Sequence, residues 1–583
     1  MRDGPRLFTS VYVPKDVSKQ HPILLLRTPY RVAPYGIDNY KDSFGANGDR
    51  FAREGFILAY QDVRGKGKSE GVFQDVRPQN ANRSSRNQID ESTDTWDTID
   101  WLVKNVPNNN GRVGLWGISY PGFYAAMGAV DAHPALKAVS PQAPVSNWFI
   151  GDDWRHNGAV MLAHTFGFFA GFGRPKQPEH RLYETRFEMG TPDGYDFHLA
   201  TGGLGNYDEK YFQGQIEFWK EVVENDTYSE FWQARNILPH MKKVKPAMLT
   251  VGGWFDAEDL WGALHVYQAA EKQSPGAVNM LVMGPWSHGQ WAGEKAERLG
   301  NVNFGSNTSK YFQENIELAF FLWYLSDKGD GGKLPEAYMF ETGRNEWHKL
   351  EAWPPKEAQT KKLFFRSGGQ LQWDVPSDKG EAYDEYVSDP ARPVPFLSFT
   401  AGGMAPEYMT DDQRHASRRT DVLTYQTEPV ENDLRVAGPL KASLFVSTSG
   451  TDSDFVVKLV DGYPDGAPDP SPNPWNVRMG GYQQLVRGEP FRGKFRSSFE
   501  KPEPFTPGRV EKVEFELPDV FHAFRRGHRI MIQVQSTWFP LVDRNPQKFM
   551  KIQNAKAEDF QKATQRVYRS VDKASGVALS VLP

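Results

Sequence analysis

Val113-Gly-Leu-Trp-Gly-Ile-Ser-Tyr-Pro-Gly122 is an apolar run that ends in a serine, and a helix-like segment, Phe123-Tyr-Ala-Ala-Met-Gly-Ala-Val130, follows it at once. This order predicts a strand, a sharp turn and a helix, with Ser119 at the tip of the turn. Such a turn holds the serine hydroxyl clear of the strand and leaves the next backbone N–H groups free to face an oxyanion. Ser119 is therefore the candidate nucleophile.

The stretch departs from the hydrolase elbow Gly-x-Ser-x-Gly, because its second glycine, Gly122, comes one position late. Pro121 suits the first turn of a helix, where its missing N–H would have had no partner. On this motif alone, Ser119 could instead cap the helix in a glycine-rich turn. The rest of the chain has to decide between the two readings.

The composition narrows the classes of partner. A chain of 583 residues predicts roughly two or three domains. A net charge of -5 offers no basic surface for nucleic acid or an anionic membrane. No apolar run reaches the roughly 18 to 20 residues of a transmembrane helix. The absence of cysteine excludes a disulfide scaffold, a cysteine-ligated zinc and a thiol nucleophile, and we expect neither a metal nor another cofactor.

The chain divides into four zones that predict an α/β fold with a separate all-β domain. Residues 1–145 alternate short apolar runs with helix-like segments, which predicts the first part of an α/β domain with a mostly parallel sheet. Residues 146–240, rich in Trp, Phe, His and Gly, predict a helical cap over the active edge of the sheet. The α/β rhythm returns in residues 241–335. Residues 336–583 show short alternating strands with Gly, Pro and Asp turns, which predicts a β-sandwich of the jelly-roll type.

Two later strands each end in a polar candidate. Asp256 follows the apolar run 246–253, and His288 follows the run 278–283. The α/β-hydrolases carry their triad in the order Ser, Asp or Glu, His, and open α/β sheets place their sites at the carboxyl ends of the strands. Either residue alone could be an ordinary loop residue. Together with Ser119 they predict a triad in which His288 accepts the serine proton and Asp256 orients His288.

At this point the sequence resembles the α-amino acid ester hydrolases, within the larger serine hydrolase group that holds bacterial cocaine esterase and the X-prolyl dipeptidyl peptidases. The resemblance runs over nearly the whole chain, and the motifs that carry it are Arg27-Thr-Pro-Tyr30, Asp62-Val-Arg-Gly65, Gly117-Ile-Ser-Tyr120, Trp254-Phe-Asp256, Gly284-Pro-Trp-Ser-His288 and Trp538-Phe-Pro540. The family's elbow has the form Gly-x-Ser-Tyr-x-Gly, which accounts for the late glycine. The resemblance implies an α/β-hydrolase domain with an inserted helical cap and a C-terminal jelly roll.

The resemblance also implies an oxyanion hole. Tyr30 matches the family's oxyanion tyrosine, whose phenol acts together with the backbone N–H after the nucleophile, here that of Tyr120. A phenol can donate a hydrogen bond to a developing alkoxide, so the assignment is chemically sound. Without the resemblance, Tyr30 would be read as an aromatic anchor of a loop.

The segment Asp256-Ala-Glu-Asp259 concentrates negative charge beside the predicted triad, and like charges so close are costly unless a cation binds there. In the family, the carboxylates that match Glu258 and Asp259 bind the substrate's α-ammonium group, joined by a cap aspartate that matches Asp153. The adjacent Asp152 leaves a one-residue offset open. Acidic residues in the first turn of a helix would be the alternative explanation of Glu258 and Asp259.

We therefore predict a serine hydrolase of α-amino acid esters and amides that passes its acyl group to water or to the amine of a β-lactam nucleus. The alternatives are an X-prolyl dipeptidyl peptidase, a cocaine-esterase-like carboxylesterase, a glutaryl cephalosporin acylase, and a catalytically silent carbohydrate-binding protein. The acidic cluster disfavours the glutaryl substrate, whose side chain is anionic. By resemblance we expect a homo-oligomer and a periplasmic or secreted location, although the first residues show no signal peptide.

Overall fold

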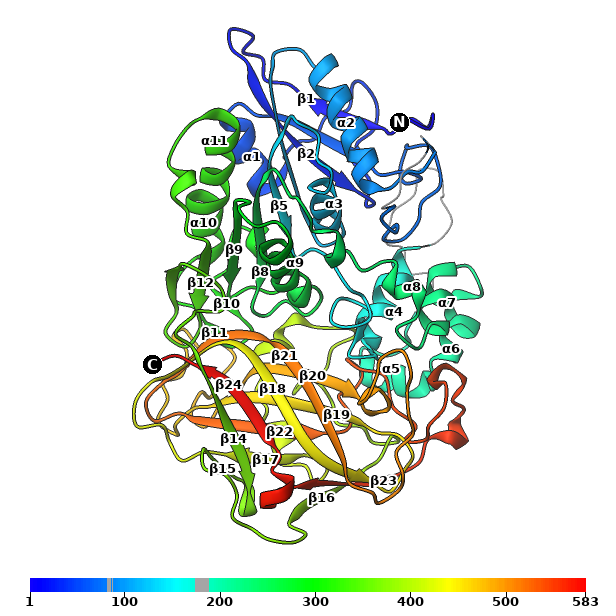
Figure 1. The fold of residues 1–583 in the computed structure, drawn as a ribbon, viewed down its shortest axis with the longest axis vertical. Coiled ribbons are helices and arrows are strands. Elements are labelled where there is room, and N and C mark those ends of the chain that lie inside the picture. The colour runs from blue at the N-terminus through cyan, green and yellow to red at the C-terminus, as the bar shows by residue number, and fades with distance from the viewer. Residues whose placement is uncertain (81–84, 86, 174–187) are drawn as a thin grey trace.

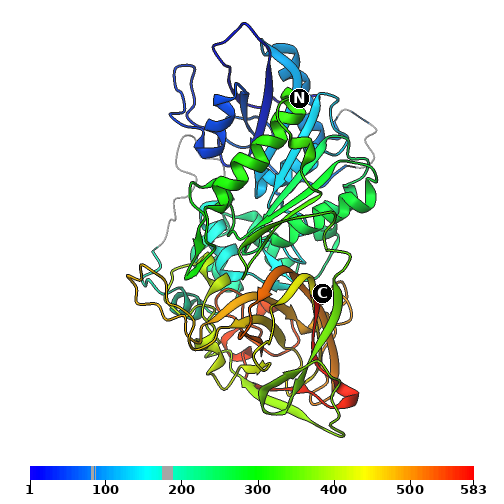
Figure 2. The same ribbon diagram turned by 90° about the vertical axis from the view of Figure 1, so that its left-hand side faces the viewer.

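The structure is a computed structural model that describes residues 1–80, 85, 87–173 and 188–583. In Figure 1 an α/β body lies above a β domain, and the helices α4 to α8 form a layer beside the junction of the two. The turned view in Figure 2 shows the C-terminus at this same junction, next to the α/β body. The predicted class, an α/β-hydrolase domain with a C-terminal β domain, is confirmed.

The α/β body is built on one sheet of nine strands. Their spatial order is β1 (Thr9–Tyr12), β3 (Ile57–Asp62), β2 (His21–Thr28), β4 (Asn109–Ile118), β5 (Leu136–Gln142), β8 (Ala247–Gly253), β9 (Asn279–Gly284), β12 (Ala337–Glu341) and β13 (Glu346–Leu350). The strands from β3 to β12 run parallel, and only the edge strands β1 and β13 are antiparallel. The central strands are almost wholly apolar because both faces of a parallel sheet are covered.

Helices cover both faces of this sheet. On one face, α2 (Glu91–Asn105) and α3 (Tyr120–Gly128) pack against alternate residues of β2, β3 and β4. On the opposite face, α1 (Gly45–Arg53) and α11 (Leu318–Ser326) contact the residues in between. The helix α9 (Leu260–Gln273) joins β8 to β9. All the parallel strands consequently deliver their carboxyl ends to one edge of the sheet.

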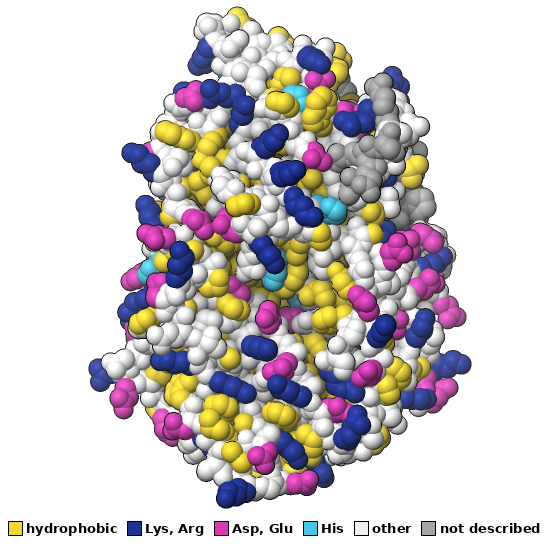
Figure 3. Space-filling view, viewed as in Figure 1, with side chains coloured by type: hydrophobic (Ala, Val, Ile, Leu, Met, Phe, Trp, Pro, Cys, Tyr) yellow, Lys and Arg dark blue, Asp and Glu magenta, His cyan; other side chains and the backbone are white. Residues whose placement is uncertain are grey.

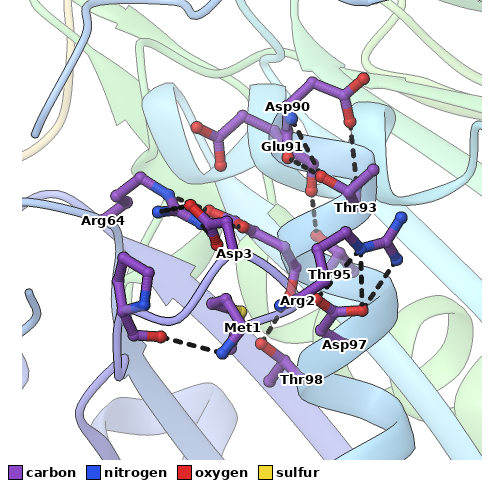
Figure 4. Close-up of polar contacts among 12 residues, drawn as sticks. Met1, Arg2, Asp3, Arg64, Asp90, Glu91, Thr93, Thr95, Asp97 and Thr98 are labelled. Carbon is purple, nitrogen blue, oxygen red and sulfur yellow. Dashed lines mark hydrogen bonds and ion pairs between the residues drawn. The ribbon is translucent and has the colours of Figure 1, made fainter. Parts of the chain in front are cut away.

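Ion pairs hold the first residues of the chain against α2. Arg2 donates to Asp97 at 2.7 Å, and Arg64 joins Asp3 at 2.8 Å to Asp94 at 2.6 Å (Figure 4). Arg64 follows β3 directly in the chain, so this bridge connects the end of a strand to the helix on its face. The turn that contains Arg64 therefore has a structural role.

The segment between β5 and β8 forms the helical cap. Its elements are the short strands β6 (Arg155–His156) and β7 (Ala159–Val160), and the helices α4 (Leu162–Gly171), α5 (Gly194–Thr201), α6 (Gly205–Tyr207), α7 (Glu217–Glu224) and α8 (Glu230–Gln233). Buried aromatic residues of these helices share one core with residues of the β domain and of α3. This shared core fixes the cap over the carboxyl ends of the strands.

The β domain follows the α/β body. Its strands are β14 (Gln359–Arg366), β15 (Gln370–Gln372), β16 (Tyr383–Ser388), β17 (Leu423–Gln426), β18 (Leu434–Thr448), β19 (Asp454–Gly462), β20 (Gln483–Arg492), β21 (Glu511–Phe524), β22 (Arg529–Gln535), β23 (Ala563–Tyr568) and β24 (Gly576–Val581). The first of them begins later than the boundary expected at residue 336, because β12 and β13 still belong to the α/β sheet. The segment after β9 therefore adds two more strands to that sheet before the chain enters the β domain.

The face of the molecule drawn in Figure 3 carries charges of both signs. In Figure 3 basic and acidic side chains are interspersed over the visible face, and neither sign gathers into a large patch. None of the helices in the described ranges is long and apolar enough to cross a bilayer.

Candidate active site

Ser119 lies at the tip of the turn between β4 and α3, as the sequence predicts. Its backbone takes φ 67° and ψ −127°, a conformation that costs a non-glycine residue about 1–3 kcal/mol. The Ser119 N–H donates to the carbonyl of Gln142 at 2.9 Å, which ties the turn to β5. A side chain on Gly122 would clash with that same carbonyl, and one on Gly117 would clash with the carbonyl of Pro121. The close crossing of β4, α3 and β5 therefore explains why the second glycine stands one position late.

Asp256 and His288 follow β8 and β9, and their side chains meet. His288 Nδ1 lies 2.9 Å from Asp256 Oδ2 and 3.0 Å from Oδ1. Asp256 Oδ1 also accepts the backbone N–H groups of Glu258 at 2.9 Å and Asp259 at 3.0 Å, so its orientation is fixed. The other ring nitrogen, Nε2, lies 3.2 Å from Glu258 Oε2. No hydrogen bond joins His288 to Ser119 in the described part of the chain.

The electrostatics of His288 follow from this pairing. Burial by itself lowers the pKa of the imidazole, but the negative charges of Asp256 and Glu258 outweigh it and raise the pKa to about 10. The carboxyl of Glu258 has a raised pKa, chiefly because of burial, although His288 and His164 oppose this. In this arrangement the protonated form of His288 is favoured at neutral pH.

A cavity of about 430 Å³ opens onto the serine. Its lining comes from the α/β body, the cap and a loop before the β domain's strand β17: Tyr30, Ser119, Tyr120, Asp153, Trp154, Ala163, His164, Gly167, Phe168, Glu258, His288, Gly403 and Met404. Six of the eight predicted site residues line this cavity: Tyr30, Ser119, Tyr120, Asp153, Glu258 and His288. A seventh, Asp256, lies behind His288 and is hydrogen-bonded to it. The predicted residue outside this group is Asp259.

The two tyrosines of the predicted oxyanion hole lie side by side. Their rings are perpendicular, with centroids 6.3 Å apart. The phenol of Tyr120 donates to Asp75 at 2.9 Å and accepts the N–H of Val76 at 2.9 Å, so this side chain has a structural role. Its backbone N–H belongs to the first turn of α3, where the helix supplies no acceptor. Tyr30 follows β2 and lines the cavity beside Ser119.

The two neighbouring cap aspartates have different surroundings. Asp153 lines the cavity, and its backbone takes the left-handed φ of 40°. Its Oδ2 accepts Trp148 Nε1–H at 2.8 Å, and its Oδ1 lies 2.9 Å from His164 Nε2. Burial acts to raise the pKa of Asp153, but the hydrogen bonds from His164 and Trp148 and the charge of His164 together outweigh it, and the pKa is lowered. Asp152 is fully buried and accepts the backbone N–H of Gly262 at 2.7 Å instead.

Asp259 differs from the other carboxylates of the cluster. It is fully buried, does not line the cavity, and neither of its oxygens has a hydrogen-bond partner among the described residues. Burial, followed by the charges of Asp153 and Asp152, raises its pKa well above the ordinary value. A neutral carboxyl is therefore favoured at this position in the ligand-free protein.

His164 is a cavity residue that the sequence did not predict. This residue lies on α4, lines the cavity, and stacks on Trp154 with ring centroids 5.5 Å apart. Its Nδ1 is 3.9 Å from Glu258 Oε1, so it stands between Glu258 and Asp153. Burial lowers the pKa of His164, but Glu258 and Asp153 outweigh it and the pKa is raised. The only sequence signal was its place in an aromatic cap segment.

The tryptophans near the motifs have mixed roles. Trp154 lines the cavity and Trp148 holds Asp153, but Trp254, Trp286 and Trp291 are buried elsewhere in the α/β body. These three tryptophans therefore do not contribute to the cavity. Phe168 and Tyr30 supply the other aromatic walls.

The described ranges contain two groups of three possible metal ligands. Within each group, the candidate ligand atoms lie within 4.8 Å of one another. The groups are Asp153, His164 and Glu258, and Glu341, Glu346 and His348. In the first group His164 already pairs with Asp153 at 2.9 Å. In the second, Arg435 donates to Glu341 at 2.6 Å. Partners of this kind satisfy carboxylates without an ion, so we assign neither group to a metal. That the protein needs no cofactor stays a prediction.

Comparisons with known proteins identify the family of this chain. The family model described as X-Pro dipeptidyl-peptidase (S15 family) matches residues 3–290, and the X-Pro dipeptidyl-peptidase C-terminal non-catalytic domain matches residues 326–577. Cocaine esterase from Rhodococcus sp. (strain MB1 Bresler) is 28% identical, over 100% of this chain and 97% of its own length.

Two solved structures are more similar. One is an aminopeptidase from a marine sediment archaeon, Thaumarchaeota archaeon, with a TM-score of 0.92, and the other is an α-amino acid ester hydrolase, with a TM-score of 0.91. Each is 38% identical to this chain, and each match covers 100% of this chain and 95% of the other. The chain therefore belongs to the X-Pro dipeptidyl-peptidase S15 family of serine hydrolases, together with cocaine esterase and the α-amino acid ester hydrolases.

Proposed function

We propose that this hydrolase cleaves esters and amides of α-amino acids through an acyl-enzyme on Ser119. The observation that carries the proposal is the presence of two carboxylates, Asp153 and Glu258, in the same cavity as Ser119 and His288. No lysine or arginine is among the described residues that line this cavity. A substrate with a positive charge close to its scissile carbonyl suits such a cavity best.

In the proposed reaction, Ser119 Oγ attacks the carbonyl carbon while its proton passes to His288 Nε2. The tetrahedral oxyanion accepts hydrogen bonds from the Tyr30 phenol and the Tyr120 backbone N–H. His288 then gives the proton to the leaving alcohol or amine, and the acyl group stays on Ser119. Water, or the amine of a β-lactam nucleus, repeats these steps as the second nucleophile and releases the acyl group. Asp256 keeps the imidazole in the tautomer that accepts at Nε2.

The proposed ammonium site consists of Asp153 and Glu258, with Asp259 behind them. The Asp153 N–H donates to the Glu258 carbonyl at 2.9 Å, which fixes the two segments to each other. Asp259 has a raised pKa in the ligand-free protein, and a nearby ammonium would favour its ionised form. We therefore assign most of the recognition to Asp153 and Glu258 and a supporting role to Asp259.

The acyl side chain would lie against Trp154, Phe168 and Met404, which are the large apolar residues of the cavity besides the tyrosines. Aromatic walls favour an aromatic acyl group such as phenylglycyl. The family relatives support the amino-acid reading, since one structure is an aminopeptidase and the other an α-amino acid ester hydrolase. The use of a β-lactam acceptor, a homo-oligomeric state and a periplasmic or secreted location remain predictions from resemblance.

The test compares hydrolysis of D-phenylglycine methyl ester, of its des-amino analogue methyl phenylacetate, and of an X-Pro anilide. We expect kcat/KM to be highest for the amino ester, and Ser119→Ala to lose both turnover and labelling by a fluorophosphonate. Equal kcat/KM for the first two esters would favour a cocaine-esterase-like carboxylesterase. A preference for the anilide would favour an X-prolyl dipeptidyl peptidase.

A further inference from the structure

Glu258 occupies the ring nitrogen that the triad needs. His288 Nδ1 is bonded to Asp256 at 2.9 Å, as in a working triad, but Nε2 lies 3.2 Å from Glu258 Oε2. Both nitrogens therefore face carboxylates, and neither is hydrogen-bonded to Ser119 in the described part of the chain. An imidazole held between two carboxylates favours a proton on each nitrogen, and in that state it cannot accept the serine proton.

Few charged groups surround the pair formed by His288 and Glu258. Asp256, Glu258 and Asp153 are the acidic groups that act on His288. Glu258 is faced by His288, by His164 at 3.9 Å, and by the like charges of Asp153 and Asp256. Since no lysine or arginine is among the described residues that line the cavity, the two histidines are the cations that the described ranges offer to Glu258 before a substrate binds.

We propose that the α-ammonium group of the substrate completes the triad by replacing His288 as the partner of Glu258. This inference rests on the proposed ammonium site. When the ammonium pairs with Glu258, His288 loses its second carboxylate, releases the Nε2 proton to solvent, and becomes able to accept the proton of Ser119. The only bond that breaks in this step is the N–H bond at Nε2, and water accepts the proton. Glu258 thereby acts as a specificity-determining residue through the catalytic base, in addition to binding the amine.

The direction of the effect follows from electrostatics. Burial opposes the charge on His288, and Asp256 and Glu258 together raise its pKa to about 10. Neutralising Glu258 removes one of the three carboxylate charges that raise this pKa. Each unit by which the pKa falls raises the neutral fraction of His288 about tenfold, as long as the pH stays below the pKa. The α-amino preference should therefore be expressed in kcat as well as in KM.

The experiment supplies the ammonium in trans. Hydrolysis of methyl phenylacetate by the wild-type protein is measured at pH 7 with increasing methylammonium chloride, and with tetramethylammonium chloride and sodium chloride as controls for bulk and ionic strength. We expect methylammonium alone to raise kcat/KM about tenfold and to move the acidic limb of the pH profile to lower pH. The rate of fluorophosphonate labelling of Ser119 should rise in parallel, which makes the result independent of the ester.

Glu258→Gln is the matched variant, since it keeps the shape of the side chain and removes its charge. It should hydrolyse methyl phenylacetate faster than the wild type and no longer respond to methylammonium, while it hydrolyses the amino ester more slowly. If this variant does not fold, the wild-type measurement in trans still decides the question.

The outcomes separate this inference from the proposed function. Methylammonium without effect on either readout, in a protein that still prefers the amino ester and loses that preference in Asp153→Asn, would overturn the release of His288 and leave ammonium recognition standing. Equal losses for the amino and des-amino esters in Asp153→Asn would overturn ammonium recognition itself, and this inference with it.

Discussion

Replacing each of the two neighbouring cap aspartates by asparagine should separate catalysis from folding. Asp152 Oδ2 accepts the N–H of Ser146 at 2.8 Å, its hydroxyl at 2.7 Å and the N–H of Asn147 at 2.8 Å, while Oδ1 accepts the N–H of Gly262 at 2.7 Å. Asp153 faces the cavity instead. The two substitutions make the same chemical change one residue apart.

The structure gives a different magnitude for each variant. In Asp152→Asn the amide oxygen can replace Oδ2, but the NH2 group then faces the buried N–H of Gly262 in the first turns of α9. An unsatisfied buried donor costs about 1–3 kcal/mol of unfolding free energy. In Asp153→Asn the charge that would pair with the substrate's ammonium is lost, which costs about 2–5 kcal/mol with amino esters. That range corresponds to a roughly 30- to 5,000-fold loss of kcat/KM.

Two measurements on each variant test these values. Urea unfolding gives the change in stability, and kcat/KM is determined for D-phenylglycine methyl ester and methyl phenylacetate. Asp153→Asn should lose most of its activity toward the amino ester and little toward the des-amino ester. Its unfolding free energy should also fall, because the Asp153 oxygens pair with buried Trp148 and His164, so the ratio of the two kcat/KM values is the deciding measurement. Asp152→Asn should be less stable, while the ratio of its two kcat/KM values should stay near that of the wild type.

The reasoning would be refuted by the reverse pattern. A change of the kcat/KM ratio in Asp152→Asn, with a normal ratio in Asp153→Asn, would move the ammonium site to the other aspartate. A parallel decrease for both esters in Asp153→Asn would show that this residue supports the triad and does not recognise the amine.

Three further predictions concern Ser119, Tyr30 and Glu317, a buried carboxyl outside the cavity that accepts Gln142 Nε2–H at 2.6 Å. Ser119→Gly should abolish turnover and raise the unfolding free energy by about 1 kcal/mol, because glycine tolerates the φ of 67°; an unchanged or lower stability in urea would contradict the strain. Tyr30→Phe should remove about 3 kcal/mol of transition-state stabilisation, which lowers kcat and changes KM little. An unchanged kcat would leave Tyr30 as a structural residue. Burial raises the pKa of Glu317 to about 7, so the fold favours its protonated form and loses that stability as pH rises from about 4 to above 7. Glu317→Gln should therefore flatten the fall in unfolding free energy between pH 5 and pH 8.5, by up to about 3 kcal/mol, and equal slopes for both proteins would contradict the buried proton.

The sequence predicted the triad because its signals are local. Ser119, Asp256 and His288 each follow an apolar strand, and the carboxyl ends of parallel strands meet at one edge of a sheet. The structure brings Asp256 and His288 into contact at 2.9 Å on that basis. The same logic failed at β12, because a short run of four apolar residues and a glutamate fits the edge of an α/β sheet as well as the start of a β domain.

Local sequence patterns could not predict which residues outside the α/β sheet reach the cavity. Asp153 turns toward the cavity because its backbone takes a positive φ, and nothing in the residue type requires that conformation. His164 arrives from α4, whose position depends on the aromatic core that the cap shares with the β domain. Met404 comes from a segment more than a hundred residues after the triad histidine. Only tertiary packing brings these three side chains to one cavity.

The cluster Asp256-Ala-Glu-Asp259 illustrates how one turn gives three carboxylates three different environments. Asp256 Oδ1 accepts the N–H groups of Glu258 and Asp259, so the chain winds around the triad carboxylate. This winding sends Glu258 toward the cavity and His288, and it sends Asp259 into the interior, where its oxygens have no hydrogen-bond partner among the described residues. In the sequence the three acids look equivalent. The hydrogen bonds of Asp256 make Glu258 the carboxylate that contacts His288 and also lines the cavity, so the amine recognition that we propose would act directly on the proposed catalytic base.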